Sequence, residues 1–384
     1  MHDQNHDHEH DHEHDHDHGH SHDHDHGHSH ERGHHHHDHQ APEAEADSRW
    51  FVIDIGAGTQ DILIHDPELP PESSLKMVLP SPARIAAGRI RAAAAGGRHV
   101  WLYGSLMGGG ALTQAVKEHL AQGLKVFSQE EPALSLFDDL ERVKGLGVEI
   151  SDSKPPETSP IPCGDVDLRG LAHAFDHFGI DIPSRFAAAA QDHGFSAQRS
   201  SREMRFETWQ EFLEKGGDPV DLFYDRPPAH LTRLAGLTRS LPGALVADSA
   251  SAALLGALLD EEALKVREQG VMVLNVGNGH TVAFLFRAGK VKGIYEHHTG
   301  LVSPELLADH LARFRKGELP DEEVRGTNGH GCQVLEPGQY QTTIITGPRR
   351  ELARGMGRMA VVHGDLMLSG CFGLVEGARL KGVL

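Results

Sequence analysis

One pattern occurs twice in the chain, about 220 residues apart. The first copy, Trp50–His65, is an apolar run, a Gly56-Ala57-Gly58 turn and a second apolar run. The second copy starts at Val271 and reads VMVLNVGNGHTVAFLF. Apolar runs rich in branched residues and separated by a glycine-containing turn are typical of buried β-hairpins. The repetition therefore predicts a duplicated architecture, with one hairpin in each of two domains.

The segments between the two copies alternate between strand-like and helix-like patterns, which favours a layered α/β fold. The expected strands are 75–79 and 99–103, and the expected helices are 83–95, 111–122, 168–178, 201–214 and 229–240. The composition of Ser151–Pro162 (SDSKPPETSPIP) predicts a loop. In the helix at 201–214, the apolar residues Phe206, Trp209, Phe212 and Leu213 share one face, so we expect them in the core rather than in a ligand site.

Histidine is concentrated at the N-terminus. Residues 1–47 hold 19 of the 32 histidines, and between His6 and His30 every second residue is histidine, separated by Asp, Glu, Gly or Ser. Such a segment has no apolar residues to bury, so we expect disorder. Neutral imidazole binds late first-row metals, and nickel or zinc is the metal we expect here. The candidate ligands are His6, His8, His10, His12, His14, His16, His18, His20, His22, His24, His26, His28, His30, His34, His35, His36, His37 and His39.

Charge and length limit the remaining possibilities. The tail carries 14 acidic groups and one basic group, a net −13 of the chain's −20, so the other 337 residues carry only −7. A domain without a basic excess argues against nucleic acid as a partner. The most apolar run, Ala250–Leu259, is about half of the ~20 residues that span a bilayer. A length above ~250–300 residues predicts two domains, placed at 48–267 and 268–384. With three cysteines and no signal-peptide pattern, we expect a cytoplasmic protein.

The first glycine turn has the residues of an anion-binding site. Gly56 and Gly58 lack Cβ, so backbone N–H groups can approach an anion closely, and Thr59 adds a hydroxyl group. Asp54 ends the strand and can hold a hydrated Mg²⁺ ion. Asp61 completes the string D-x-G-x-G-T-x-D, which is far more specific than a G-x-G turn alone.

This string resembles a phosphate motif of the superfamily that contains acetate and sugar kinases, heat-shock chaperone ATPases and actin. The resemblance implies a two-domain α/β fold that holds Mg-ATP between paired hairpins. It implies that Asn275, Gly277, Gly279 and Thr281 form the second phosphate motif, with Asn275 where many members have Asp. Because an amide cannot act as a base, phosphoryl transfer or hydrolysis would depend on Asp54 and Asp61.

Two further segments resemble the same superfamily in order and spacing. Val246–Leu254 is similar to the helix at the domain interface, with Asp248 where an acidic residue often faces the cleft. Ile344–Arg350 is similar to the adenosine motif, a strand that opens through Gly347 into a helix, with Pro348 at its first position and Arg349 near adenine. Gly364–Gly373 would be the second connecting segment.

A narrower resemblance rests on IDIGAGTQDIL, on Ala189–Gly194 (AAQDHG) and on the terminal MLSGCFGL. These strings resemble an uncharacterised prokaryotic family described as pyruvate formate-lyase activating enzyme. Radical activases need three cysteines in a C-x₃-C-x₂-C loop to hold a [4Fe–4S] cluster. Cys163, Cys332 and Cys371 are dispersed, so the sequence argues against radical chemistry.

Other histidines are candidates outside these motifs. Asp192 and His193 put an acid beside an imidazole after an apolar run, although neighbouring strand residues point to opposite faces. His297, His298 and His330 could receive a metal from the tail, or could be structural.

The residues and the resemblances together predict a Mg-ATP-binding protein, an ATPase coupled to activation or maturation of a client metalloenzyme. Its tail is similar to those of nickel metallochaperones. Asp54 would position Mg²⁺, Asp61 would orient the attacking water, and Asp248 would complete the catalytic set. One alternative is a small-molecule kinase in which residues 130–245 build the substrate pocket. Another is a non-catalytic nucleotide-binding scaffold or a metal-storage protein.

Overall fold

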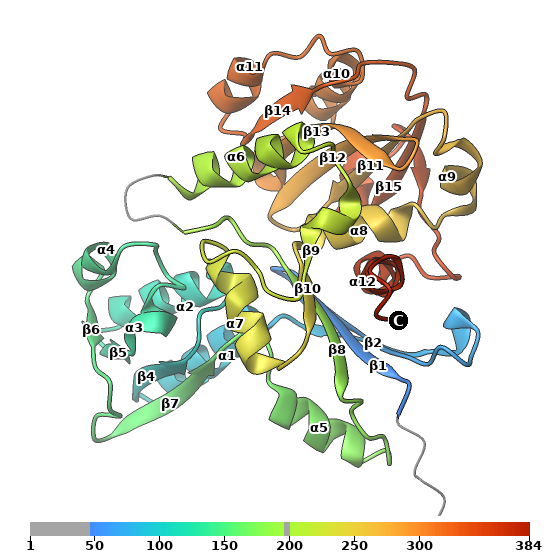
Figure 1. Cartoon of the computed structure of the whole chain (residues 1–384). Coiled ribbons are helices and arrows are strands. Elements are labelled where there is room, and N and C mark those ends of the chain that lie inside the picture. Colours follow the sequence, from blue (N-terminus) through green and yellow to red (C-terminus); the bar gives the residue numbers. More distant parts are fainter. Residues whose placement is uncertain (1–46, 196–199) are drawn as a thin grey trace, which may run out of the picture. The chain divides into compact units, whose positions relative to one another are not determined.

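The computed structural model describes residues 47–195 and 200–384 (Figure 1). Within it, Asp47–Leu384 forms one compact unit, so the expected division at residue 267 stays a prediction. In this part of the chain, every helix is too short or too polar to cross a lipid bilayer.

The first sheet contains the first glycine turn. Its six strands lie in the order β3-β2-β1-β8-β10-β9. β1 is antiparallel to β2 and parallel to β8, and β8 is parallel to β10. The strands are β1 (Trp50–Ile55), β2 (Thr59–His65), β3 (Leu75–Pro80), β8 (Arg185–Ala190), β9 (Phe223–Tyr224) and β10 (Leu245–Ala247).

The second sheet contains the second glycine turn. Its order is β14-β13-β12-β11-β15-β16, with β11 antiparallel to β12 and parallel to β15. The strands are β11 (Val271–Val276), β12 (His280–Arg287), β13 (Lys290–His298), β14 (Gly331–Val334), β15 (Thr342–Thr346) and β16 (Arg358–Met359).

Five strands of each sheet are equivalent in order and direction. β3-β2-β1-β8-β10 corresponds to β13-β12-β11-β15-β16: an antiparallel meander of three strands, followed by two strands parallel to its last member. β9 and β14 are additional edge strands. This duplication confirms the α/β fold of actin-like and sugar-kinase-like type that the paired hairpins predicted.

A third, four-stranded sheet with its own core is inserted between β3 and β8. All its pairs are parallel, in the order β6-β5-β4-β7. The elements of this segment are α1 (Pro82–Ala95), β4 (His99–Gly104), α2 (Gly110–Ala121), β5 (Val126–Ser128), α3 (Glu130–Ala133), α4 (Leu140–Gly145), β6 (Val148–Ile150) and β7 (Thr158–Cys163). α1 begins where the Ser81 hydroxyl accepts a hydrogen bond from Arg84 N and Pro82 occupies the first turn, both typical of a helix start.

The loop expected at Ser151–Pro162 is wrong for its second half, because β7 covers Thr158–Cys163. The strand was not predicted because Pro160 and Pro162 are typical of a loop. β7 pairs only with β4 within the described sheet, so it is an edge strand, where proline costs no ladder hydrogen bond. Ile161 lies between the prolines and is buried in the core of this sheet.

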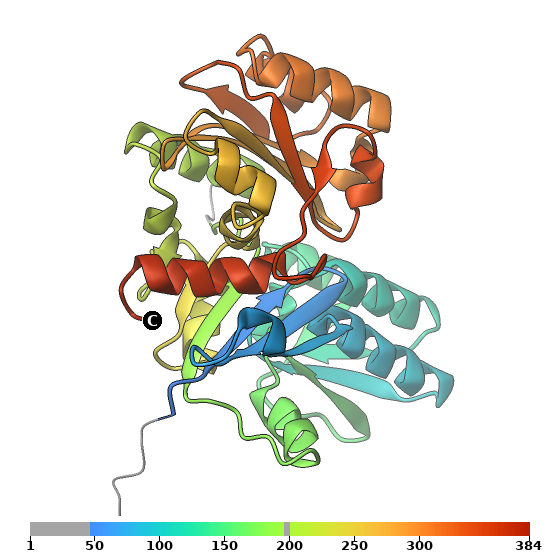
Figure 2. The same cartoon turned by 90° about the vertical axis from the view of Figure 1, so that its right-hand side faces the viewer.

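Two helices, α8 (Ser249–Ala257) and α12 (Ser369–Leu380), pack against each other between the first and second sheets (Figures 1 and 2). Their backbones touch at glycines. A methyl group at Gly256 would lie 1.8 Å from the Ser369 carbonyl oxygen, and one at Gly373 would lie 1.7 Å from that of Ala252. Neither position can accept a side chain without separating the helices, so the glycines set their spacing.

The remaining helices cover the sheets. α6 (Ser201–Glu214) contacts β13, and its four apolar residues, Phe206, Trp209, Phe212 and Leu213, are buried in the core shared by both large sheets, as the helical pattern predicted. The others are α5 (Leu168–Asp176), α7 (Thr232–Ser240), α9 (Glu261–Val266), α10 (Pro304–Phe314) and α11 (Asp321–Gly326).

The helix crossing predicts opposite effects for two glycine substitutions. Gly373→Ala should lower the free energy of unfolding by several kcal/mol, because the methyl group meets backbone atoms that cannot rotate away. Gly88→Ala, in the interior of α1, meets nothing within 4 Å and should stabilise by about 0.5–1 kcal/mol through helix propensity. Urea unfolding of both variants checks this, and equal stabilities would contradict the close crossing.

Candidate functional site

The two glycine turns have the same backbone geometry. Gly56 N donates to Thr59 O at 2.9 Å, and Gly277 N donates to His280 O at 2.9 Å. The strand registers place Asp54 opposite Asp61 in the first hairpin, and Asn275 opposite Val282 in the second. The carboxylate pair therefore exists in one copy only.

The same register assigns the turn residues. Counted from each glycine turn, His280 occupies the place of Thr59, and Thr281 occupies the place of Gln60. Thr281 is fully buried, and its hydroxyl group lies 3.0 Å from that of Thr299. The side chain that the second turn offers in the place of the Thr59 hydroxyl is thus an imidazole.

The tips of the two turns meet beside one cavity. A methyl group at Gly58 would lie 2.5 Å from Nδ2 of Asn278, so this glycine allows the close approach. Both turns line a cavity of about 700 Å³. Within the described residues, the backbone N–H groups of Ala57, Gly58, Asn278 and Gly279 donate no hydrogen bond. Free N–H groups of this kind can bind an anion.

Asp54 and Asp61 lie behind the first turn, against the start of α12. Ser249, which lines the cavity, donates to Asp54 Oδ1 at 2.6 Å, and a methyl group at Gly370 would overlap Asp54 Oδ2. Burial, together with the charge of Asp61, raises the pKa of Asp54 to about 7. Burial raises the pKa of Asp61 to about 6, and Asp61 Oδ1 has no hydrogen-bond donor among the described residues. The pair is thus poorly neutralised by the protein around it.

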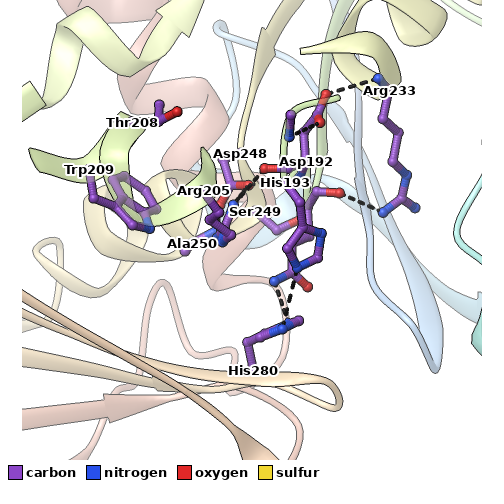
Figure 3. A network of polar contacts seen from close by, with 12 residues as sticks. Asp192, His193, Arg205, Thr208, Trp209, Arg233, Asp248, Ser249, Ala250 and His280 are labelled. Atoms are coloured by element: carbon purple, nitrogen blue, oxygen red, sulfur yellow. Dashed lines mark hydrogen bonds and ion pairs between the residues drawn. The ribbon is translucent and has the colours of Figure 1, made fainter. Parts of the chain in front are cut away.

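Asp248 lines the cavity and belongs to a buried ion network (Figure 3). It caps α8 by accepting from Ala250 N at 3.0 Å, and it receives two bonds from the Arg205 guanidinium, at 2.8 and 3.1 Å. Arg205 Nε donates to Glu296 on β13 at 2.6 Å. Burial opposes the charge of Asp248, but the Arg205 guanidinium holds its pKa below the ordinary range.

A second network fixes the segment after β8. Asp192 Oδ2 accepts from the Arg233 and Leu234 backbone N–H groups at the start of α7, at 2.9 and 3.0 Å. The Arg233 guanidinium binds Asp165 and the Gln191 carbonyl oxygen. Asp192 therefore faces α7 and not the neighbouring His193, as strand alternation predicted.

Four histidines come together on the other side of this segment. His193 Nε2 lies 3.4 Å from His280 Nε2 (Figure 3), and His330 and His298 pack against His280 with ring centroids 4.7 Å away in each case. His297 points elsewhere, because its Nε2 lies 3.1 Å from the Thr327 hydroxyl oxygen.

Gly347 and Arg349 lie beside the second hairpin, outside the residues that line the described cavity. Gly347 is needed there, because its φ is +97° and a methyl group would lie 2.6 Å from Asn275 Oδ1. Arg349 N donates to Val276 O at 2.9 Å. The helix expected to open at Pro348 is a 3-10 turn at Arg350–Ala353, so that expectation is wrong in type and start.

Sequence reasoning missed several residues that line the cavity. Gly108 and Gly109 precede α2, and Gly110 is its first residue. The signal was present in the sequence, as three glycines between an expected strand and an expected helix. Arg205 gave no signal, because it lies within an amphipathic helix pattern and its partners are 43 and 91 residues away. The histidines from His6 to His39 lie outside the described residues.

The three cysteines do not fit an iron–sulfur cluster. Cys163, Cys332 and Cys371 are all buried, and each belongs to a different hydrophobic cluster. Burial raises the pKa of Cys163 and of Cys332 to about 12, so both thiols stay protonated. No place in the described fold therefore brings together the three thiolates that such a cluster needs.

Duplicated sheets whose glycine turns meet at one cavity define an α/β protein of actin-like and sugar-kinase-like fold. A family model described as "Putative pyruvate format-lyase activating enzyme (DUF1786)" matches residues 107–352. The chain belongs to this family, which confirms the narrower resemblance. A comparison with curated proteins gives no match.

Among solved structures, the chain is similar to an inorganic polyphosphate/ATP-glucomannokinase from Arthrobacter sp. strain KM, with 13% identity and a TM-score of 0.31 over 87% of this chain and 99% of that one. It is also similar to the ethanolamine utilization protein EutJ from Carboxydothermus hydrogenoformans, with 11% identity and a TM-score of 0.26 over 84% of this chain and 88% of that one.

The raised pKa values of Asp54 and Asp61 predict a pH effect on stability. Both lie above the ordinary 3.8, so between about pH 4 and 7 the native state holds protons that the unfolded chain has released. These two groups should therefore make the free energy of unfolding fall as pH rises through that window, and Asp54→Asn should reduce the fall. Urea unfolding at several pH values measures it.

Asp176→Asn, on an exposed part of α5, is the matched control and should keep the wild-type slope. The N-terminal histidines are identical in all three proteins, so their titration cancels in the comparison. An Asp54→Asn slope equal to that of wild type would contradict the raised pKa.

Proposed function

We propose that the cavity binds a Mg²⁺–nucleoside triphosphate and that the protein is an ATPase or phosphotransferase. One observation supports this most strongly. Two turns of equal geometry, one from each sheet, present unbonded backbone N–H groups at the same cavity. A polyphosphate is the ligand whose charge can be shared between two such turns. A volume of about 700 Å³ falls within the range of small-molecule sites.

The carboxylate pair supports the metal part of the proposal. Asp54 and Asp61 are neighbours across the hairpin, and each has a raised pKa. We assign Asp54 to the cation and Asp61 to the orientation of the attacking group, and Asp248 to the cavity wall. When bound, Mg²⁺ would supply positive charge to the phosphates. Asp54 and Asp61 would then hold its water ligands and stay ionised at neutral pH.

The adenosine end of the ligand is assigned to Gly347 and Arg349, which lie beside the second hairpin. The phosphates are assigned to Gly56, Gly58 and Thr59 in the first turn and to Gly277 and Gly279 in the second. Asn275 and Thr281 support the second turn from behind. Asn275 Oδ1 lies close to Gly347, and Thr281 contacts Thr299, whose hydroxyl group donates to Gly277 O at 2.8 Å.

The cellular role that we propose is activation or maturation of a metalloenzyme in the cytoplasm, with the histidine tail collecting nickel or zinc. The tail supports this proposal by composition, since alternating imidazoles and carboxylates bind such ions. Nucleotide hydrolysis would supply the free energy, and the domain closure coupled to it would act on a client protein.

A small-molecule kinase is the second candidate, and the inserted sheet favours it. Glu131, Ser135 and Asp138 from this insertion line the cavity, together with Arg233 and Arg239 from α7. These groups could hold a polar acceptor beside the phosphates. ADP formation that requires an added sugar or acid would distinguish this candidate from the ATPase.

Nucleotide binding is tested by calorimetry of the full chain with ATP, with and without Mg²⁺. We expect Mg²⁺ to tighten ATP binding by the wild type. In the presence of Mg²⁺, Asp54→Asn should bind ATP at least about tenfold more weakly than wild type, a loss of about 1.4 kcal/mol. Asp176→Asn is the control and should behave as wild type. No binding at millimolar ATP would refute the proposal and favour a scaffold or storage protein.

The tail is tested by a full-length variant in which the thirteen histidines at even positions from 6 to 30 become serine. It should lose most of the bound Ni²⁺ or Zn²⁺ and keep its melting temperature. In the wild type, tail binding should weaken between about pH 7.5 and 5.5, because protons compete for the imidazole nitrogens. Metal titrations at several pH values measure this. Tail binding that is unchanged at pH 5 would point to carboxylate ligands.

A further inference from the structure

The histidines beside the second turn come from segments far apart in the chain. His193 follows β8 of the first sheet, whereas His280 is the first residue of β12. His298 is its cross-strand partner at the end of β13, and His330 precedes β14. The fold thus brings four imidazoles together at the point where the first sheet approaches the second.

The separations suit a shared ion. One ring nitrogen each of His193, His280 and His330 lies within 4.8 Å of the other two. The closest pair, His193 Nε2 and His280 Nε2, is 3.4 Å apart. Two imidazole nitrogens on a tetrahedral zinc ion, each at ~2.0–2.1 Å, are about 3.4 Å apart. The His193–His280 pair already has that spacing, and a small ring rotation brings His330 to it.

Hydrogen bonding does not explain why these rings are buried together. His330 is 1% exposed, and its Nδ1 has no hydrogen-bond partner among the described residues. Buried polar atoms usually have a partner, so a buried nitrogen without one needs another explanation. Burial lowers the pKa of His280 to about 2 and that of His330 to about 3, which keeps both imidazoles neutral and able to bind a metal.

The surroundings can hold a cation. Gln191 contacts Nδ1 of His280, which leaves Nε2 of His280 facing His193. A metal-binding histidine donates its second ring N–H to an acceptor, and Gln191 would supply that acceptor with its amide oxygen, rather than its nitrogen, turned toward Nδ1 of His280. The ion network beside them, Arg205 with Asp248 and Glu296, carries a net charge of −1 and partly offsets the charge of the ion.

We propose that His193, His280 and His330 bind one divalent ion of the zinc or nickel class at the wall of the cavity. His298 is a positioning residue, packed against the rings of His280 and His330 with centroids 4.7 and 4.6 Å away. His193 and His280 line the cavity, so the remaining coordination position faces it. Water or a phosphate oxygen could bind there. This site is separate from the tail, and it does not depend on the proposed nucleotide activity.

A second group of possible ligands contrasts with this one. Asp309, His310 and Glu323 also bring ligand atoms together. Arg313 already binds both carboxylates, and His310 Nδ1 lies 3.1 Å from the Tyr295 hydroxyl oxygen. Both carboxylates are thus already paired with an arginine, although His310 Nε2 has no hydrogen-bond partner among the described residues, so the proposal is confined to the first group.

The direct test is a crystal of the full chain soaked with Zn²⁺ and measured at the zinc absorption edge. We expect an anomalous peak about 2.0–2.1 Å from one nitrogen of each of His193, His280 and His330. The position of the peak separates this site from zinc held by the tail. Zinc in the crystal without a peak among these three residues would overturn the proposal.

Solution measurements with Co²⁺ provide a test that needs no crystal. Four-coordinate Co²⁺ absorbs visible light far more strongly than octahedral Co²⁺. His330→Gln and His193→Gln should each lose one equivalent of the intense band, with at least tenfold weaker binding of that equivalent. His297→Gln is the matched control, because His297 contacts Thr327 on the opposite face, and it should keep the band.

All these variants keep the tail, so differences between them report on the folded part. Melting temperatures show whether each variant is folded. If folded His330→Gln and His193→Gln bind Co²⁺ with the affinity and the band of wild type, these histidines are not ligands and the proposal is wrong. Because the readout is metal binding, failure of the ATP experiment leaves this result unaffected.

Discussion

The arrangement of the cavity depends on one buried guanidinium. Arg205 on α6 binds Asp248 at the start of α8 and Glu296 on β13, so a single side chain joins α8 to the second sheet. Each carboxylate also has a neutral partner: Trp209 donates to Glu296 at 2.7 Å, and Asp192 N donates to Asp248 at 3.0 Å. Buried charges are tolerated only when their hydrogen bonds are satisfied in this way. A rotation of one sheet against the other would disturb these charged hydrogen bonds, so Arg205 couples the positions of the two glycine turns.

The hairpins and the core helix could be predicted from the sequence because their signals are local. Apolar runs on both sides of Gly56–Gly58 and of Gly277–Gly279 indicate two strands and a turn within sixteen residues. The spacing of Phe206 and Trp209 indicates a buried helix face. β7 was missed because its prolines indicate a loop unless its position at a sheet edge is known. His193, His298 and His330 could be named as candidates from the sequence, but His280 and the grouping could not, because the four residues span up to 137 residues and only the strand pairing reveals that His280 faces His298.

The duplicated hairpins have diverged in their side chains while keeping their backbone. The first places Asp54 and Asp61 opposite each other behind its turn, and the second places Asn275 and Val282 at the equivalent positions, with His280 in the place of Thr59. Oxygen ligands suit magnesium, and imidazole ligands suit zinc or nickel. One internal repeat thus provides the proposed hard-cation site, and the other contributes to the proposed nitrogen site. The two halves of a symmetrical fold can in this way keep two kinds of ion apart within one cavity.

The buried thiols have a consequence for metal selection. All three cysteines of the sequence lie in hydrophobic clusters with raised pKa values, and the Cys371 thiol donates a hydrogen bond to the Asp61 carbonyl oxygen. A protonated thiol in a hydrocarbon environment is a poor ligand. The described fold therefore offers a metal no thiolate. Soft monovalent copper loses one of its preferred ligands in this way, which favours divalent ions that bind imidazole nitrogen.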